Sequence, residues 1–175
     1  MMRASQRSDL PLLLALFNAP DTRILRHYAL QLFGNQTVTS EQMFPAFEQQ
    51  EGDVAVLRCL TGANGALVGW GTMMPHIYPW PNPIYQLHQL VVDCYLVPTH
   101  LDQTATLLRE VLEHLPKDHM ATQLLAYVSL DHDVVPAAYE ANGFKRIGLH
   151  PAAYAEERGR SSDVAMYLRE VPPRR

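Results

Sequence analysis

The spacing of apolar residues changes at Pro98, and this change constrains the fold more than any other feature of the sequence. Residues 84–97 contain the mostly apolar run of a buried strand, whereas residues 101–115 repeat apolar residues at helical spacing. The helical set comprises Leu101, Ala105, Leu108, Val111, Leu112 and Leu115. A strand followed directly by an amphipathic helix predicts a sheet with helices packed against it.

The other segments predict the same class of fold. Strands are expected at residues 3–5, 54–59, 66–74, 123–129, 144–149 and 164–168, and helices at 9–17, 24–33, 39–49 and 133–142. Residues 54–59 and 66–74 should form an antiparallel hairpin, and the Pro-rich residues 75–83 a long loop within the domain. We therefore expect residues 1–171 to form a single α/β domain, with residues 172–175 as a loose tail. Its central sheet should be mixed, mostly antiparallel and about seven strands wide.

Charge and hydropathy exclude several classes of function. The 14 basic residues are outnumbered by 18 acidic ones, so no basic surplus favours binding to nucleic acid. No apolar run approaches the roughly 20 residues that span a bilayer, so no membrane partner is expected. The apolar residues 10–17 resemble a signal segment, but the following Asn18 to Asp21 read as a helix end, and a cytoplasmic protein is the expectation.

The two cysteines, Cys59 and Cys94, do not form a disulfide framework in a chain of 175 residues. Each lies in an apolar strand segment, so we expect two buried, reduced thiols, with a bridge between neighbouring strands as the alternative. Asp131, His132 and Asp133 invite a metal-binding interpretation. Their spacing matches no closed ligand set, and the acidic pair fits a helix start, so no metal site is predicted.

Four stretches together resemble the GNAT superfamily of acyl-CoA-dependent N-acyltransferases. They are residues 3–13, the hairpin sequence GALVGWG at 65–71, LVVD at 90–93 followed by LLREVL at 107–112, and AYEANGFKRIG at 138–148. The last is the most specific, and its Asn142-Gly143 pair suits a helix that must stop and reverse into a strand. The resemblance covers nearly the whole chain and implies a GNAT-like fold.

The resemblance also implies a role for Tyr139, which lies one turn before that helix stop. In the family, a tyrosine here acts as the general acid that protonates the departing coenzyme A thiolate. A phenol titrates near 10 and remains protonated at neutral pH, so it can donate as charge develops on sulfur. The alternative is an aromatic ring that packs the helix on the sheet.

A second implied element is the strand before Pro98. In the family this strand diverges from its neighbour, and its main chain holds the pantetheine arm and polarises the thioester carbonyl; here Leu90, Val91 and Val92 would do so. His88 shares strand parity with Leu90 and Val92 and is a candidate base for the acceptor amine. A strand histidine paired with a neighbour is the equal alternative.

The loop after this strand departs from the family pattern. Relatives place glycines there so that main-chain N–H groups approach a diphosphate, whereas residues 98–106 hold no glycine and no arginine. Asp102 adds negative charge. The candidate diphosphate-binding residues are Gln103, Thr104, Ala105 and Thr106, and His132 stands where relatives carry a coenzyme-binding asparagine.

The resemblance thus implies an N-acetyltransferase that uses acetyl-CoA as co-substrate. It would transfer an acetyl or related acyl group directly to an amine of a small molecule or a protein. The glycine-free loop leaves a second class open: a GNAT-fold binding or structural module that has lost coenzyme binding. The acceptor cannot be read from the sequence, and a homodimer is left open.

Overall fold

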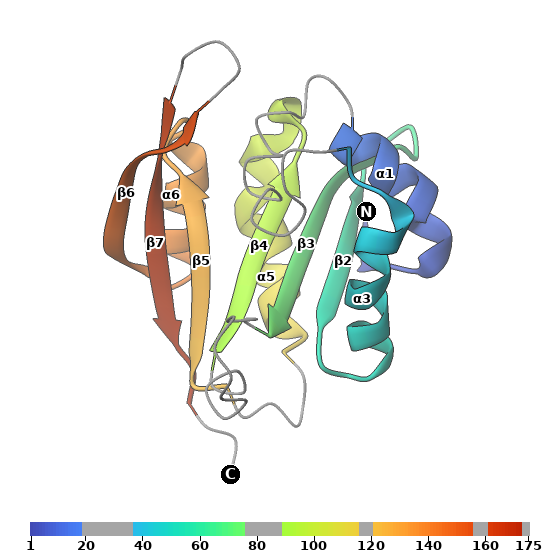
Figure 1. Ribbon diagram of the computed structural model, residues 1–175, viewed down its shortest axis with the longest axis horizontal. Helices are drawn as coiled ribbons and strands as arrows, with labels where there is room; N and C mark the ends of the chain where they lie inside the picture. The colour runs from blue at the N-terminus through green and yellow to red at the C-terminus, as the bar shows by residue number, and fades with distance from the viewer. Residues whose placement is uncertain (19–36, 76–88, 116–120, 156–160, 173–175) are drawn as a thin grey trace.

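A computed structural model describes residues 1–18, 37–75, 89–115, 121–155 and 161–172 (Figure 1). Seven strands form one sheet in the order β1-β2-β3-β4-β5-β7-β6, and every pairing is antiparallel except β4 with β5. The strands are β1 (Met2–Ala4), β2 (Val56–Thr61), β3 (Leu67–Pro75), β4 (Gln89–Leu96), β5 (Gln123–Ser129), β6 (Lys145–Ala155) and β7 (Ser161–Glu170). The sheet is therefore mixed and mostly antiparallel, as the sequence predicts.

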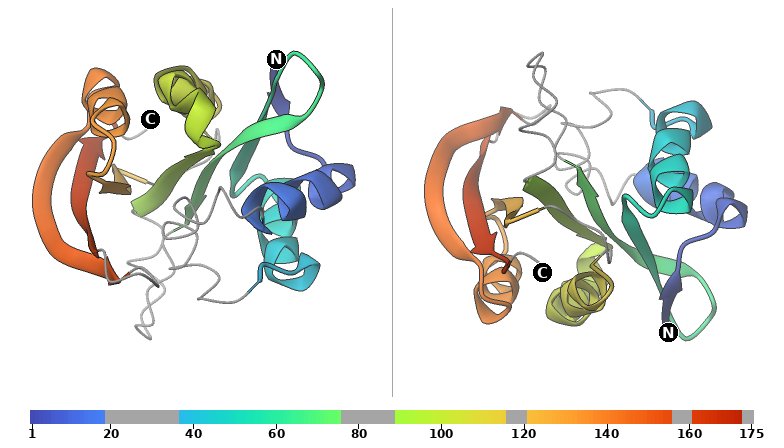
Figure 2. Two further views of the ribbon diagram at one scale, coloured as in Figure 1. Left: turned by 90° about the horizontal axis from the view of Figure 1, so that it is seen from above. Right: turned by 90° about the horizontal axis from the view of Figure 1, so that it is seen from below.

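Helices cover both faces of this sheet (Figure 2). They are α1 (Leu10–Asn18), α3 (Ser40–Glu51), α5 (Thr104–Glu113) and α6 (Val134–Ala141), with short 3₁₀ helices at Arg7–Asp9 and Pro98–Gln103. Helices α5 and α6 pack together on one face, and α1 and α3 lie on the other. Because strand side chains alternate, β2, β3 and β4 each contribute to two separate cores, one on each face.

The core under α5 and α6 contains Val92 of β4 and Tyr139 of α6, together with aliphatic residues of α5 and β5. The opposite core, under α1 and α3, is built around three aromatic rings: Phe17 meets Trp70 edge-on at 5.4 Å and Tyr95 at 5.2 Å. Residues at even and odd positions of β4 therefore point to different cores. Val92 faces α5, and Tyr95 faces α1.

A polar network joins β1 to the first helices beside the aromatic core. Arg3 donates two hydrogen bonds of 2.6 Å to the carboxylate of Asp9, and the main-chain N–H of Gln6 donates to the same carboxylate at 2.8 Å. The indole N–H of Trp70 donates to the hydroxyl of Ser5, which lies 2.9 Å from the sulfur of Cys59. These buried polar atoms are thus satisfied within the fold.

The predicted elements within the described residues are confirmed; most ends differ by one or two residues, and α5, β6 and β7 differ by more. The helix predicted from residue 101 begins at Thr104, because Pro98 starts a 3₁₀ turn in which His100 has non-helical angles (φ −129°, ψ 18°). Strands β6 and β7 are longer than predicted. The helix expected at 24–33 and most of the loop expected at 75–83 lie outside the described residues.

The reversal after α6 follows the Asn142-Gly143 pair as expected. Gly143 has φ +83°, a conformation that favours glycine, and the N–H of Phe144 returns to the carbonyl of Tyr139 at 3.1 Å. Cys59 and Cys94 are free thiols, so the alternative of a bridge between them is wrong. No helix among the described residues has the length and apolar character needed to cross a bilayer.

Candidate active site

Strands β4 and β5 are joined over only a short segment. Their parallel register runs through three pairs, Gln89 with Gln123, Leu90 with Leu124 and Val91 with Leu125. Beyond Val91 no further pairing joins the two strands within the described residues, and Figure 1 shows them diverging. The β5-facing edge of β4 from Val92 onward is therefore released from the sheet ladder.

A pocket occupies this divergence. Its lining comes from both strands, from the turn that leads into α5 and from α6: Asp93, Cys94, Tyr95, Leu101, Thr104, Tyr127, Val128, Ser129, His132, Val135 and Tyr139. Asp93 and Tyr95 belong to the α1 face of β4, and Cys94 to the α5 face. The pocket therefore has walls from both faces of the sheet.

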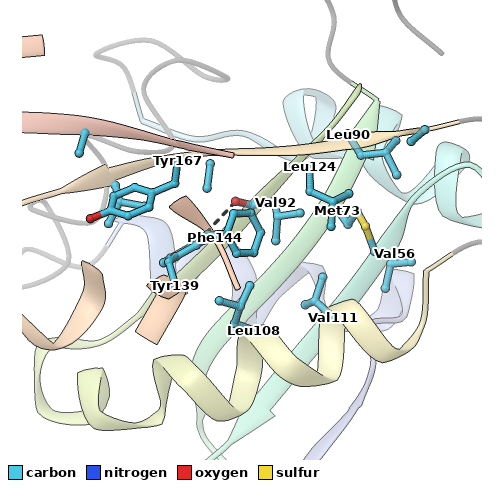
Figure 3. Close-up of a cluster of buried hydrophobic side chains, with 14 residues drawn as sticks. Val56, Met73, Leu90, Val92, Leu108, Val111, Leu124, Tyr139, Phe144 and Tyr167 are labelled. Atoms are coloured by element: carbon cyan, nitrogen blue, oxygen red, sulfur yellow. Dashed lines mark hydrogen bonds between the residues drawn. The ribbon is translucent and has the colours of Figure 1, made fainter. Parts of the chain in front are cut away.

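The ring of Tyr139 is packed in the core, and the residue also lines the pocket. Its ring is buried and meets Phe144 edge-on at 5.3 Å, with Tyr167 at 6.3 Å on another side (Figure 3). Its hydroxyl donates a long hydrogen bond of 3.4 Å to the main-chain carbonyl of Val92 and lines the pocket. Burial raises the pKa of Tyr139 well above its ordinary value, and Cys94 and Asp93 raise it further, so the phenol stays protonated.

Asp93 is a buried carboxyl group in the same pocket that the sequence analysis did not single out. It is 8% exposed and lines the pocket on the α1 face of β4. Burial raises the pKa of Asp93 to about 7, and a hydrogen bond from Tyr95 opposes part of that rise. The signal in the sequence is a single acidic residue inside the apolar run 90–97, a position where a strand rarely tolerates charge.

The main-chain positions predicted for the thioester lie partly inside the sheet ladder. Leu90 and Val91 still pair with β5, so of the three predicted positions only Val92 lies beyond the described β4–β5 ladder. The pairing depends on backbone register, which the apolar side chains do not encode. His88 lies outside the described residues.

The start of α5 differs from an open helix N-terminus. The 3₁₀ turn runs directly into the helix, and the N–H of Thr104 donates to the carbonyl of Leu101. The hydroxyl of Thr104 also donates to that carbonyl, at 2.6 Å, and the residue is fully buried against the pocket. Gln103 turns its amide toward Asp102, whereas Ala105 and Thr106 are half-buried on the first turn. The N–H of Thr104, one of the predicted diphosphate-binding residues, is thus already bonded.

His132 is exposed and lines the pocket at the turn before α6, and its contact with a coenzyme stays a prediction. Burial raises the pKa of Cys94 far above its ordinary range, and burial raises the pKa of Cys59 to about 11. Neither thiol has the character of an activated nucleophile. Among the described residues, no three histidine, cysteine or acidic side chains are grouped to hold a metal ion.

The fold has many relatives among solved structures. A GNAT superfamily phosphinothricin acetyltransferase from Sinorhizobium meliloti, solved in complex with acetyl-CoA, is 19% identical; the match covers 99% of this chain and 92% of that one, with a TM-score of 0.72. A GNAT-family acetyltransferase from Streptococcus pneumoniae is 18% identical over 98% of this chain and 99% of its own, with a TM-score of 0.75.

A ribosomal-protein-alanine N-acetyltransferase from Brucella melitensis is similar in the same way, at 19% identity, with 98% of this chain and 99% of that chain covered and a TM-score of 0.68. No protein-family model matches the sequence, and a search of curated proteins finds no match. The seven-stranded mixed sheet and its helices therefore have the GNAT fold, and the resemblance found in the sequence is confirmed at the level of fold.

Proposed function

We propose that this protein is an acetyl-CoA-dependent N-acetyltransferase that acts on an amine of a small molecule or a protein. The observation that carries the proposal is the divergence of β4 from β5, lined by the hydroxyl of Tyr139. It gives a released main-chain edge and a protonated phenol in one pocket. The fold of known acetyltransferases and the acetyl-CoA bound in one of them support the choice of donor.

The residues of the pocket fit a thioester donor. When bound, acetyl-CoA supplies an acyl carbon with a thiolate leaving group. The main chain at Val92 would hold the pantetheine arm, and the pocket walls from Leu101, Val128 and Val135 are apolar. Thr104 and His132 line the same pocket, and Ala105 and Thr106 leave a small first turn on α5. The diphosphate is assigned to this turn, where the helix dipole favours an anion.

Tyr139 is assigned as the proton donor. Its hydroxyl now donates to the Val92 carbonyl over a long 3.4 Å, so moving that proton to a nearby thiolate gives up only a weak hydrogen bond. The packing of its ring against Phe144 and Tyr167 holds the hydroxyl at the pocket. The orientation of the donor is therefore fixed before any ligand binds.

Transfer is assigned as direct, from thioester to amine, with no acyl group on the protein. The new C–N bond forms as the C–S bond breaks, and the sulfur receives a proton. Cys94 is the only cysteine on the pocket wall among the described residues, and its raised pKa keeps it as a poorly nucleophilic thiol. Initial-velocity kinetics should therefore indicate a ternary complex rather than a ping-pong pattern.

The second candidate is a GNAT-fold module without coenzyme binding, favoured by the absence of glycine from residues 98–106 and by the bonded N–H of Thr104. A thermal-shift titration with acetyl-CoA separates the two. Acetyl-CoA at 100 times its Kd should add about 2.7 kcal/mol of stability. An unchanged melting temperature at millimolar acetyl-CoA would reject the enzyme and leave the binding module.

A further inference from the structure

Asp93 is an unusual group for the interior of a sheet. It lies in the middle of β4, and its side chain points to the α1 face, on the same side as Tyr95. No lysine or arginine lies among the described residues that line its pocket. A buried carboxylate without a cation is costly, so a fold that keeps one at this place has a use for it or for its protonated form.

A second buried polar group beside Asp93 has no hydrogen-bond partner in the part of the chain that the structure describes. Thr72 on β3 is directly opposite Asp93 in the antiparallel register and faces the same side of the sheet. Thr72 is fully buried, and its hydroxyl oxygen has no hydrogen-bond partner among the described residues. Two buried polar side chains therefore lie next to each other on the α1 face with unused hydrogen-bonding capacity.

Asp93 and Tyr139 line the same pocket from opposite faces of the sheet. Both line the pocket, but Tyr139 approaches the strand from the α6 side and contacts Val92, whose side chain points into the α5 core. Asp93 is the next residue along β4 and points to the opposite face. A reacting group in the divergence of β4 and β5 would thus meet a proton donor on one face and a carboxylate on the other.

We propose that Asp93 binds the ammonium group of the acceptor and takes its proton, and that the acceptor reaches the pocket from the α1 face of the sheet. This inference rests on the proposed transferase function and extends it by naming the base and the charge of the acceptor. An ammonium ion supplies the cation that the carboxylate lacks and up to three N–H donors for Asp93 and the nearby hydroxyl of Thr72.

The proton balance is complete. The carboxylate of Asp93 takes one proton from the ammonium, leaving a neutral amine with a lone pair. The nitrogen attacks the acyl carbon as the C–S bond breaks, Tyr139 gives its proton to sulfur, and the second proton lost by nitrogen returns to the tyrosinate. Asp93 then releases its proton to solvent. An Asp93 pKa of about 7 suits this task, because a group that titrates near neutral pH can both accept the proton and release it.

Titration of Asp93 by ¹³C NMR tests the inference without turnover. The other titratable groups on the pocket wall are Tyr95 and Cys94 on β4, Tyr127 on β5, and His132 and Tyr139 at α6. The Asp93 carboxyl, assigned through Asp93→Asn, should titrate near pH 7. Tyr95→Phe should move that midpoint to higher pH, because the Tyr95 hydrogen bond holds the pKa of Asp93 down. Added butylamine should move it to lower pH, because a bound ammonium favours the carboxylate.

The pH dependence of kcat/KM for an amine acceptor tests the assignment of Asp93 as the base. Putrescine, tyramine and a peptide with N-terminal alanine serve as probes, and kcat/KM for the fastest is followed across pH. The parent should lose activity below about pH 7. Asp93→Asn should lower kcat/KM at pH 7 by roughly 10²–10⁴ and bind acetyl-CoA as before. Its residual rate should rise tenfold per pH unit up to the pKa of the amine, since only the free amine then reacts.

Asp131→Asn is the matched control, because Asp131 is exposed and is not part of the pocket wall. It should keep both the rate and the acidic limb. The inference is overturned if Asp93 titrates below about pH 5, if butylamine leaves its midpoint unchanged, or if Asp93→Asn stays within threefold of the parent with the acidic limb intact. Failure of the parent to bind acetyl-CoA would overturn the transferase instead, and the butylamine titration would still decide whether Asp93 binds amines.

Discussion

The hydroxyl of Tyr139 donates a 3.4 Å hydrogen bond to the main-chain carbonyl of Val92, and this contact joins α6 to the strand edge that β5 leaves unpaired. A side-chain donor and a released main-chain carbonyl thus meet at the point where the sheet opens. The hydrogen bond is long, whereas the ring that carries the hydroxyl is closely packed. The packing role of the Tyr139 ring can therefore be separated by experiment from the proton donation proposed for its hydroxyl.

Tyr139→Phe should abolish most activity and leave the fold intact. The ring and its contact with Phe144 remain, and only the proton donor is lost, so kcat should fall by roughly 10²–10⁴. The loss of one long hydrogen bond should cost at most about 1 kcal/mol of stability. Tyr167→Phe is the matched control, because its hydroxyl bonds to Glu140 outside the pocket wall. A kcat for Tyr139→Phe within threefold of the parent would assign Tyr139 to packing alone.

Asp102→Asn should strengthen acetyl-CoA binding. Asp102 is an exposed carboxylate just before α5, where the diphosphate is assigned, and its removal takes away a like charge. An effect of about 0.3–1 kcal/mol corresponds to a two- to fivefold lower Kd, and it should shrink at high salt. Glu113→Gln, at the other end of α5, serves as the control for the change of net charge. Equal or weaker affinity in Asp102→Asn, measured by calorimetry, would count against this placement of the diphosphate.

Gly71→Ala should destabilise the fold, because α5 lies directly on β3 at this glycine. A Cβ there would lie 2.6 Å from a methyl group of Val111 and 3.1 Å from the side chain of Leu107. Such overpacking typically costs about 1–3 kcal/mol, measured by urea unfolding. Gly148→Ala is the control, since its new Cβ would find its nearest neighbour at 3.8 Å in the side chain of Met166. Equal stability of the two variants would show that α5 shifts freely on the sheet.

The Arg3–Asp9 ion pair should make stability depend on pH. The bonds from Arg3 hold the pKa of Asp9 below its ordinary value of 3.8, so the contribution is complete above that value and is lost as pH falls through the lower folded pKa. Asp9→Asn should cost about 2 kcal/mol at pH 7, and this difference should vanish toward pH 2. Glu51→Gln breaks the exposed pair with Arg7 and should cost little at any pH. Parallel unfolding curves for Asp9→Asn and Glu51→Gln would reject this account.

Most of the fold follows from local pattern. Alternation predicted the β2–β3 hairpin, helical spacing predicted α5, and Asn142-Gly143 predicted the reversal after α6. The 3₁₀ turn before Thr104 was not predicted, because the apolar spacing at Leu101 fits either kind of helix. The order of strands in the sheet depends on contacts between residues distant in sequence, and it was not predicted.

The site was predicted less completely than the fold. Tyr139, Thr104 and His132 do line one pocket. Tyr139 belongs to a motif, whereas Thr104 and His132 were placed by their spacing from it and from the preceding strand. Asp93 was not predicted, because the side chains that share strand parity with Leu90 and Val92 belong to the core under α5. Asp93 points to the other face of β4. Which face of β4 meets the acceptor depends on the placement of α1 and α5, and the strand sequence alone does not contain that information.

The three-pair ladder between β4 and β5 determines which kinds of mutation this protein can accept during evolution. A point substitution replaces a side chain and leaves the peptide group in place, so the main-chain carbonyl at position 92 survives exchange for another apolar residue of similar size. Isoleucine there should be tolerated, whereas threonine would bury a hydroxyl in the apolar core. A one-residue deletion between Gln89 and Val91 would instead slide the register and turn every later side chain of β4 to the other face. Such a site is therefore sensitive to insertions and deletions in β4 and tolerates conservative side-chain substitutions.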